Sequence, residues 1–160
     1  MVSNPTSFVT VSSLSTLPHS FARLTGISIE EINANRLELA AKYAVRWNVV
    51  VVLKGAATVI GCPDGTVYVN KTGCEAMATG GCGDVLTGII AGLAAQGVSL
   101  QEATLCGVFL HGLAGEYVAD GKVGLAAGEI ANFLPEARED VFEMLDTEEL
   151  VYNHAVKVIE

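Results

Sequence analysis

The segment that begins at Gly80 carries the clearest chemical potential in this chain. Three glycines, a thiol and a carboxylate stand together there, in the order Gly80, Gly81, Cys82, Gly83 and Asp84. Glycines at a helix start let consecutive backbone N–H groups turn toward one point, and the positive end of the helix dipole adds to their attraction for an anion. The sequence therefore predicts an anion nest at a helix start, with phosphate as the natural ligand.

Asp84 is the unusual residue of this segment. No Lys-Ser or Lys-Thr pair follows the glycines, which excludes a Walker loop, and the third glycine of a dinucleotide fingerprint is missing. A carboxylate is stabilised by the helix dipole, yet it repels a phosphate in the same nest. Two interpretations stay open: a base that takes the proton from a substrate hydroxyl during phosphoryl transfer, or an Asp that caps a tight strand-to-helix turn.

Lys54 is a second candidate for the same chemistry. It follows Val49–Leu53, a continuous apolar run that is typical of a strand buried on both faces. Open α/β sheets bind ligands at the C-terminal ends of their strands. The alternative is a surface lysine whose alkyl chain lies along apolar neighbours. His111, alone in an apolar helix, is interpreted as a packing residue, and Met77 as part of the core.

Periodicity, caps and turn signals predict the elements that position these groups. We expect a short strand within the first 20 residues around Phe8, Val9 and Val11, a helix from Ser28 to Asn48, a strand over Val49–Leu53, a hairpin of Thr58–Ile60 and Thr66–Val69, helices over Val85–Gln96 and from Ser99 to about Asp120, a short helix from about Ala126 to Leu134 before Pro135, and a β-like end over Ala155–Ile159.

Five glycines lie inside the two longer helices that follow the hairpin, namely Gly88, Gly92, Gly107, Gly112 and Gly115. Each costs up to ~1 kcal/mol relative to alanine in a helix interior. Their helical spacing suggests close backbone approach, either to a second helix or to a ligand.

Composition limits the class of protein. The 160 residues are predicted to form a single domain, and 51% hydrophobic against 17% charged residues excludes a disordered chain. A formal net charge of −9 speaks against nucleic acid and anionic membranes as partners. The most apolar stretch is far shorter than the ~20 residues of a membrane span. The four cysteines lack zinc spacing, so we expect no metal site, reduced thiols and a cytoplasmic location.

The stretch Met77–Gly88 resembles the signature of the ADP/ATP-dependent NAD(P)H-hydrate dehydratases, which belong to the ribokinase-like superfamily. The same family is matched by Leu53–Thr58, Gln96-Gly97 and His111–Gly115, and more loosely by Pro18-His19 with Ala22–Gly26, in consistent order from about Leu17 to Pro135. The resemblance implies an α/β fold, namely the C-terminal half of a ribokinase-like fold. That half has a central, mostly parallel sheet flanked by helices, and a β-hairpin before the Gly-rich helix start.

The resemblance also implies an activity and a site. Such enzymes repair hydrated NADH or NADPH: ADP or ATP with Mg²⁺ phosphorylates the added hydroxyl, phosphate is eliminated, and the dihydronicotinamide double bond is restored. Asp84 would be the base at the substrate hydroxyl, and His19 would contact the hydrated nicotinamide. The nucleotide would be held by Lys54, Gly55, Ala56, Ala57 and Thr58 together with Gly80, Gly81, Cys82 and Gly83.

The chain also departs from the family pattern. Cys74-Glu75 replaces an Asn-Pro-like pair, Cys82 replaces a hydroxyl residue, and the Gly-Glu expected shortly after His19 is absent. The family's catalytic unit is longer, so the N-terminal half is expected to be missing here. We therefore expect a homo-oligomer, or a partner that supplies that half, because a half-sheet exposes an edge.

Two other functions stay open at this point. The same nest and carboxylate serve any phosphorylation of a hydroxyl, so a ribokinase-like kinase for a hydroxymethylpyrimidine, a thiazole or a sugar alcohol is one alternative. A degenerate module that binds a nucleotide or a partner without turnover is the other, and the cysteine replacements and the short chain favour it.

Overall fold

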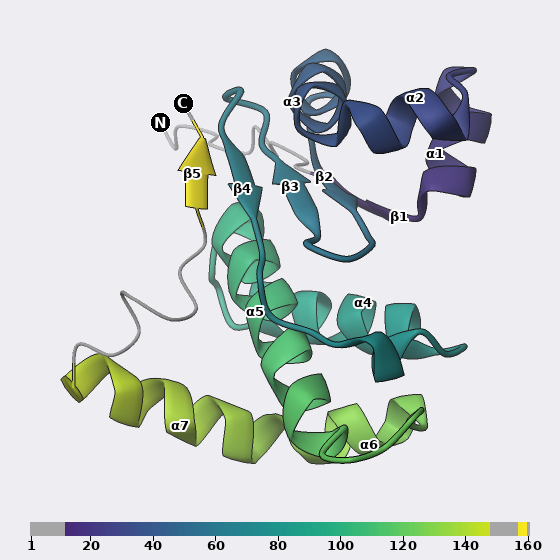
Figure 1. Cartoon of the computed structure of the whole chain (residues 1–160). Coiled ribbons are helices and arrows are strands. Elements are labelled where there is room, and N and C mark those ends of the chain that lie inside the picture. The colour runs from purple at the N-terminus through teal and green to yellow at the C-terminus, as the bar shows by residue number, and fades with distance from the viewer. Residues whose placement is uncertain (1–11, 148–156, 160) are drawn as a thin grey trace, which may run out of the picture.

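The computed structural model describes residues 12–147 and 157–159, and its centre is a five-stranded sheet in the order β1-β2-β3-β4-β5 (Figure 1). The strands are β1 (Ser12–Thr16), β2 (Val49–Leu53), β3 (Val59–Gly61), β4 (Val67–Val69) and β5 (Lys157–Ile159). The mixed α/β class is confirmed, and so is the hairpin, which β3 and β4 form. The expectation of a mostly parallel sheet is wrong for the described strands. Only β1 and β2 run parallel, because the hairpin and β5 add three antiparallel pairings.

Helices cover both faces of this sheet (Figure 1). They are α1 (Pro18–Thr25), α2 (Ile29–Ala34), α3 (Arg36–Trp47), α4 (Cys82–Ala95), α5 (Leu100–Val118), α6 (Ala127–Asn132) and α7 (Leu134–Thr147), with a 3₁₀ turn at Glu75–Met77. The side chains of β2 alternate between the two layers. Val51 and Leu53 pack in the core beneath α1 to α3, whereas Val50 and Val52 pack against α4 and α5. The absence of polar residues from β2 is thus explained by burial on both sides.

The predicted helix from Ser28 to Asn48 is broken at Asn35. Ser28 caps α2 as expected, since its hydroxyl accepts from the Glu31 N–H at 3.2 Å. The Asn35 side chain donates to the Glu31 carbonyl at 3.1 Å, and its backbone leaves the helical region at φ −128°. An asparagine that bonds its own backbone competes with helix propagation. A new helix, α3, therefore starts at Arg36, and it ends at Asn48 as predicted, with φ +53°.

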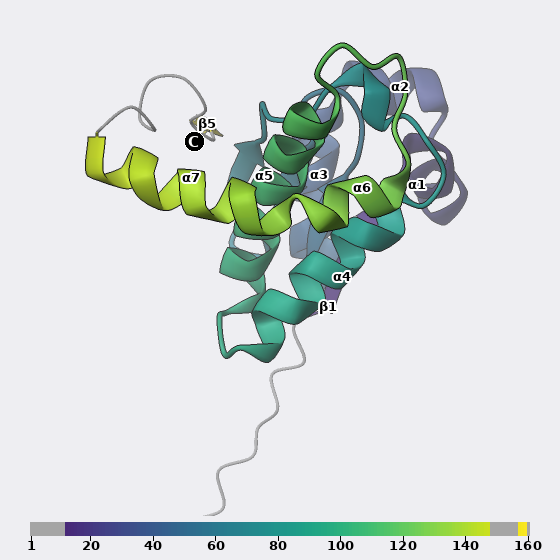
Figure 2. The ribbon, with the colours of Figure 1, turned by 90° about the horizontal axis from the view of Figure 1, so that it is seen from below.

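The C-terminal region holds a helix that the sequence did not reveal. The short helix expected before Pro135 ends earlier, at Asn132, and Pro135 lies in the first turn of α7. Proline is tolerated there because a first-turn N–H has no intrahelical acceptor. Figure 2 shows α6 and α7 running end to end across α5. The strand expected around Phe8–Val11 and the residues Ala155 and Val156 lie outside the described residues.

The glycines of α5 allow close approach, as the sequence suggested. A Cβ at Gly107 would lie 2.8 Å from the Ile90 side chain of α4. A Cβ at Gly112 would collide with the backbone and side chain of Thr72, and one at Gly115 with Met77. The segment between β4 and α4 therefore lies directly on α5. Met77, expected in the core, is half-buried in this contact.

The glycines of α4 behave differently from those of α5. Nothing within the described residues lies within 4 Å of a Cβ placed at Gly88 or Gly92. Close approach to a second helix at these two positions is therefore wrong for the described residues, whereas close approach to a ligand stays a prediction.

This contrast gives a stability test. Gly112→Ala should lower the free energy of unfolding by about 1–3 kcal/mol, because the added methyl forces the Thr72 backbone away from α5. Gly92→Ala is the matched control and should raise it by up to ~1 kcal/mol, since alanine is the better helix former and the space is open. Urea unfolding of both variants measures the two effects. Equal stability of both variants would show that the Thr72 contact imposes no constraint.

Candidate functional site

The start of α4 has the backbone geometry that the predicted anion nest requires. Gly81 occupies the N-cap position with φ +91°, and no side chain caps the helix. Its carbonyl accepts from the N–H groups of Asp84 at 3.0 Å and of Val85 at 3.1 Å. In the described part of the chain, the N–H groups of Cys82 and Gly83 have no such acceptor. They remain available to an anion at the positive end of a 14-residue helix.

Lys54 reaches this helix start from the end of β2. Its N–H donates to the Thr16 carbonyl at 2.8 Å, so its backbone continues the pairing of β1 with β2. A Cβ built at Gly83 would lie 2.6 Å from the Lys54 Nζ. Glycine at position 83 therefore leaves the space that the ammonium group occupies. Lys54 is half-buried and forms no ion pair among the described residues.

The other residues expected to contact a nucleotide form the loop from Lys54 to Thr58. Gly55, Ala56 and Ala57 are exposed, and the Thr58 hydroxyl donates to the Gly55 carbonyl at 3.2 Å. The backbone is left-handed at Ala57, with φ +54°, a region that residues with a side chain rarely adopt. This loop follows the C-terminal end of β2. The Lys54 side chain extends from it to Gly83 at the start of α4.

Arg36 bonds to this loop through its guanidinium, a role that the sequence did not reveal. Its Nη1 donates to the Ala56 carbonyl at 2.7 Å and its Nη2 to the Leu53 carbonyl at 2.8 Å. Burial lowers the pKa of the Arg36 guanidinium from its ordinary value. No sequence signal distinguishes an arginine that bonds a distant loop from a solvent-exposed arginine at the first position of a helix.

Asp84 is the third residue of α4 rather than its cap. The capping interpretation is therefore wrong, because Gly81 holds the N-cap position. The Asp84 carboxylate is exposed and takes part in no hydrogen bond among the described residues. Its position in the first turn suits the helix dipole. The side chain is thus unengaged beside the nest.

His111 packs under the nest, in keeping with its interpretation as a packing residue. It is 9% exposed, and its buried Nε2 has no hydrogen-bond partner. Burial lowers the pKa of His111 and the Lys54 charge lowers it further, while contact with the Cys82 backbone opposes both. The neutral imidazole is therefore favoured.

Cys82 stands where the resemblance led us to expect a hydroxyl residue. It is buried, and burial raises the pKa of its thiol, with contact to the Thr79 backbone acting in the opposite direction. The raised pKa keeps the thiol protonated, which argues against a nucleophilic role at this helix start.

Two hydrogen bonds fix the segment that leads from the hairpin to the nest. The Thr72 hydroxyl donates to the Phe109 carbonyl at 3.0 Å, and the Gly73 N–H donates to the Glu116 carboxylate at 2.7 Å. Both acceptors belong to α5. The role of Glu116 was not foreseen from the sequence, since nothing in its spacing linked it to Gly73.

His19 lies at the start of α1, close in sequence to Thr16, the residue that pairs with Lys54. Its side chain is exposed, and no hydrogen bond of the described residues involves it. The structure thus places His19 at the same end of β1 as Lys54. It gives no direct contact between His19 and the nest.

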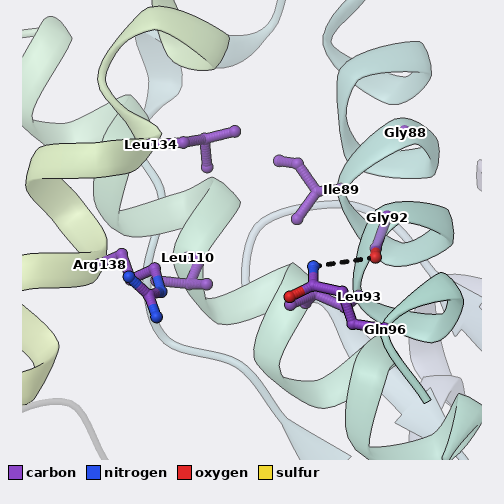
Figure 3. A pocket seen from close by; sticks show the side chains of 8 residues that line it. All are labelled: Gly88, Ile89, Gly92, Leu93, Gln96, Leu110, Leu134 and Arg138. Atoms are coloured by element: carbon purple, nitrogen blue, oxygen red, sulfur yellow. Dashed lines mark hydrogen bonds between the residues drawn. The ribbon is translucent and has the colours of Figure 1, made fainter. Parts of the chain in front are cut away.

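A shallow apolar groove lies elsewhere, between the C-terminal half of α4 and helices α5 and α7 (Figure 3). Gly92, Leu110 and Arg138 are among its lining residues. It is remote from the N-terminus of α4 along that helix, so the groove and the nest are separate features. Within the described residues, no group of three or more His, Cys, Asp or Glu side chains is placed to hold a metal ion. No described helix has the length and apolarity needed to cross a bilayer.

The arrangement of sheet and helices is shared with a ribokinase-like protein. A solved ribokinase-like superfamily protein from Enterococcus faecalis superposes with a TM-score of 0.66 at 28% identity, covering 80% of this chain and 44% of its own. The family model for NAD(P)H-hydrate dehydratase matches residues 17–136. The chain belongs to the NAD(P)H-hydrate dehydratase family.

Individual relatives agree with this assignment. A bifunctional NAD(P)H-hydrate repair enzyme of Moorella thermoacetica is 49% identical over 132 residues, which cover 81% of this chain and 25% of the relative. The ADP-dependent (S)-NAD(P)H-hydrate dehydratase of Bacillus subtilis is 40% identical over 120 residues, which cover 74% of this chain and 44% of that enzyme. A B. subtilis ADP/ATP-dependent NAD(P)H-hydrate dehydratase co-crystallised with ATP/Mg²⁺ superposes with a TM-score of 0.78 at 37% identity. The match covers 81% of this chain and 48% of that structure. This chain thus spans less than half of each relative.

The lowered pKa of His111 predicts a pH dependence of stability. Because the folded-state pKa lies below the unfolded value of 6.5, the contribution of His111 is fully present above that value. It is lost as the pH falls through the lower folded-state pKa. The free energy of unfolding should therefore drop more steeply between about pH 7.5 and about pH 5.5 in the wild type than in His111→Gln. Urea titrations at a series of pH values compare the two slopes. Parallel slopes would mean that His111 titrates as it does in the unfolded chain.

Proposed function

We propose that this chain is the nucleotide-binding and catalytic portion of an NAD(P)H-hydrate dehydratase. It would bind ADP or ATP at the start of α4 and act as a hydro-lyase on hydrated NADH or NADPH. The observation that carries the proposal is the approach of the Lys54 ammonium to Gly83 at the mouth of the nest. The names of the relatives supply the substrate class, which the geometry alone does not define.

The charges of the site support an anionic ligand. The nest supplies unengaged N–H groups, and Lys54 and Arg36 add two cations that no described carboxylate pairs with. Phosphate accepts hydrogen bonds from backbone N–H and ammonium groups, so a nucleotide phosphate fits these donors. Mg²⁺ belongs to the proposal as the counterion of the nucleotide, since proteins commonly bind it through substrate phosphates and water.

The chain's own residues divide the work as follows. The nucleotide supplies the phosphoryl group that makes the added hydroxyl of the substrate a good leaving group. Asp84 takes the proton from that hydroxyl, and the unengaged state of its carboxylate supports this role. Lys54 and the amides of the nest neutralise phosphate charge. The loop Gly55–Thr58 holds the rest of the nucleotide together with Gly80 and Gly81, and His19 contacts the nicotinamide.

The alternative as a kinase gains no specific support. A hydroxyethylthiazole kinase of Pyrococcus horikoshii superposes with a TM-score of 0.68, but at 17% identity this likeness concerns the fold alone. The alternative as a binding module without turnover is separated from the proposal by the activity assay below.

We also propose that a second copy or a partner chain completes the fold. β1 is an edge strand of the described sheet, and α4 leaves the exposed, open positions Gly88 and Gly92 in its groove with α5 and α7. Edge strands readily pair with another chain. The cytoplasmic location remains a prediction from the sequence.

Nucleotide binding is tested by the contact at Gly83. Gly83→Ala should leave the melting temperature nearly unchanged, because the atom it displaces is the far end of a flexible lysine. It should weaken ADP binding by about 1–3 kcal/mol, as Lys54→Ala should, through loss of a charge-assisted hydrogen bond. Gly92→Ala, which lies outside the nest and where the space is open, is the control for calorimetry. Wild-type affinity in both Gly83→Ala and Lys54→Ala would remove Lys54 from the site.

Catalysis is tested at Asp84. Asp84→Asn should cost only about 0.3–1 kcal/mol of stability, the worth of a first-turn charge on the helix dipole. ADP binding should hold or improve, because a negative charge beside the nest is gone. Turnover should fall by roughly 10²–10⁴, the usual contribution of a positioned base.

The assay for this second test is the recovery of NADH absorbance from its hydrate with ADP or ATP present. It is run on the chain alone and with the N-terminal half of a relative added. An Asn variant with full activity would end the catalytic role of Asp84. A wild type that binds ADP but turns over no hydrate in either format would favour the binding module.

A further inference from the structure

Arg36 joins the end of β2 to the loop that carries Lys54. Its guanidinium donates from Nη2 to the Leu53 carbonyl at the end of β2, and from Nη1 to the Ala56 carbonyl in the middle of the loop. The distances are 2.8 and 2.7 Å. These two donors point in directions fixed by one planar group, so they set the distance between the two carbonyls.

The loop from Lys54 to Thr58 needs such support. Ala57 is left-handed at φ +54°, which disfavours a residue with a side chain, and Gly55 stands at φ +150°. A Cβ at Gly55 would lie 3.1 Å from Nη2 of Arg36, so the backbone packs closely over the guanidinium. Strained backbone persists only where the surroundings hold it in place.

The surroundings of Arg36 also exclude a role as a surface ion-pair partner. It is half-buried, its Nε is buried without an acceptor, and no described carboxylate pairs with it. A half-buried guanidinium that bonds only main-chain carbonyls is a structural fork rather than a solvated charge. Its position at the first residue of α3 is rigid, because the helix packs on β2 and β3.

We propose that Arg36 is a positioning residue for nucleotide binding, which holds the Lys54–Thr58 loop in the shape that aims Lys54 at the start of α4. The proposal rests on the proposed function for its ligand, but the loop shape itself is independent of any ligand. Arg36 acts through the loop and makes no contact with Gly83 or Asp84. A planar fork is required, so a lysine at this position does not replace it.

The first arm of the test measures the loop in the unliganded full chain. Amide hydrogen exchange over residues 54–58 should rise roughly 10-fold or more in Arg36→Ala, because local opening becomes easier when the fork is removed. Arg36→Lys, which keeps the charge without the fork, should behave in the same way. Arg46→Ala is the matched control, since Arg46 is an exposed arginine of the same helix that lies over the Tyr43 ring. Unchanged exchange in Arg36→Ala and Arg36→Lys would overturn the proposal.

The second arm measures ADP affinity by calorimetry at a temperature where every variant is folded. Arg36→Ala and Arg36→Lys should both bind roughly 10- to 100-fold more weakly than the wild type, and Arg46→Ala should bind equally well. If Arg36→Ala does not fold, Arg36→Gln replaces it, since the glutamine side chain keeps one NH₂ donor group. Full affinity in Arg36→Lys would overturn the proposal, because charge alone would then suffice. A wild type that binds no ADP would overturn the proposed function instead, and the exchange arm would then decide on the fork.

Discussion

The approach of the Lys54 ammonium to the backbone of Gly83 is the contact on which the site depends. It joins the end of a buried strand to the start of a helix from a later part of the chain, and it requires that position 83 carry no side chain. An ammonium at the positive end of a helix is unfavourable unless an anion is shared between them. The pairing of Lys54 with the nest therefore makes sense as half of a binding site. Neither Lys54 nor Arg36 forms an ion pair with a carboxylate among the described residues.

The remaining elements hold this contact from two sides. On one side, β1 fixes the backbone of Lys54 through the Thr16 carbonyl, and Arg36 fixes the loop that follows. On the other side, the glycines of α5 let the segment before α4 lie close, so that Thr72 bonds directly to the helix backbone. The motif around His111 is thus a packing motif. Burial favours the neutral form of the His111 imidazole in this motif.

Much of this architecture was predictable because it rests on local signals. The burial of β2 followed from its unbroken apolar run, the hairpin from the turn between its strands, and the nest from clustered glycines at a helix start. The predictions failed where a side chain competes with its own backbone or where a proline has two meanings. Asn35 breaks a helix that periodicity continues. Pro135 was expected to stop the short helix before it, but it lies in the first turn of the next helix, α7.

The roles of the positioning residues could not be predicted from the sequence, for a different reason. Arg36 and Glu116 act through hydrogen bonds to main-chain atoms that are distant along the chain, and such acceptors leave no pattern in side-chain types. The prediction of a mostly parallel sheet was also wrong, since a hairpin and a C-terminal strand add antiparallel pairings to a single parallel one. The first-turn position of Asp84 depended on where the helix begins, and Gly81 rather than Asp84 is the cap.

The central claim is that one anion site joins the end of β2 to the start of α4. Backbone NMR of the full chain during titration with ADP tests it most directly, because each amide reports separately. The account predicts that the largest shifts fall in two groups at once, Lys54–Thr58 and Gly80–Asp84, with the groove residues of α4 from Gly92 to Gln96 unmoved. Shifts confined to that groove, or to only one of the two groups, would contradict it.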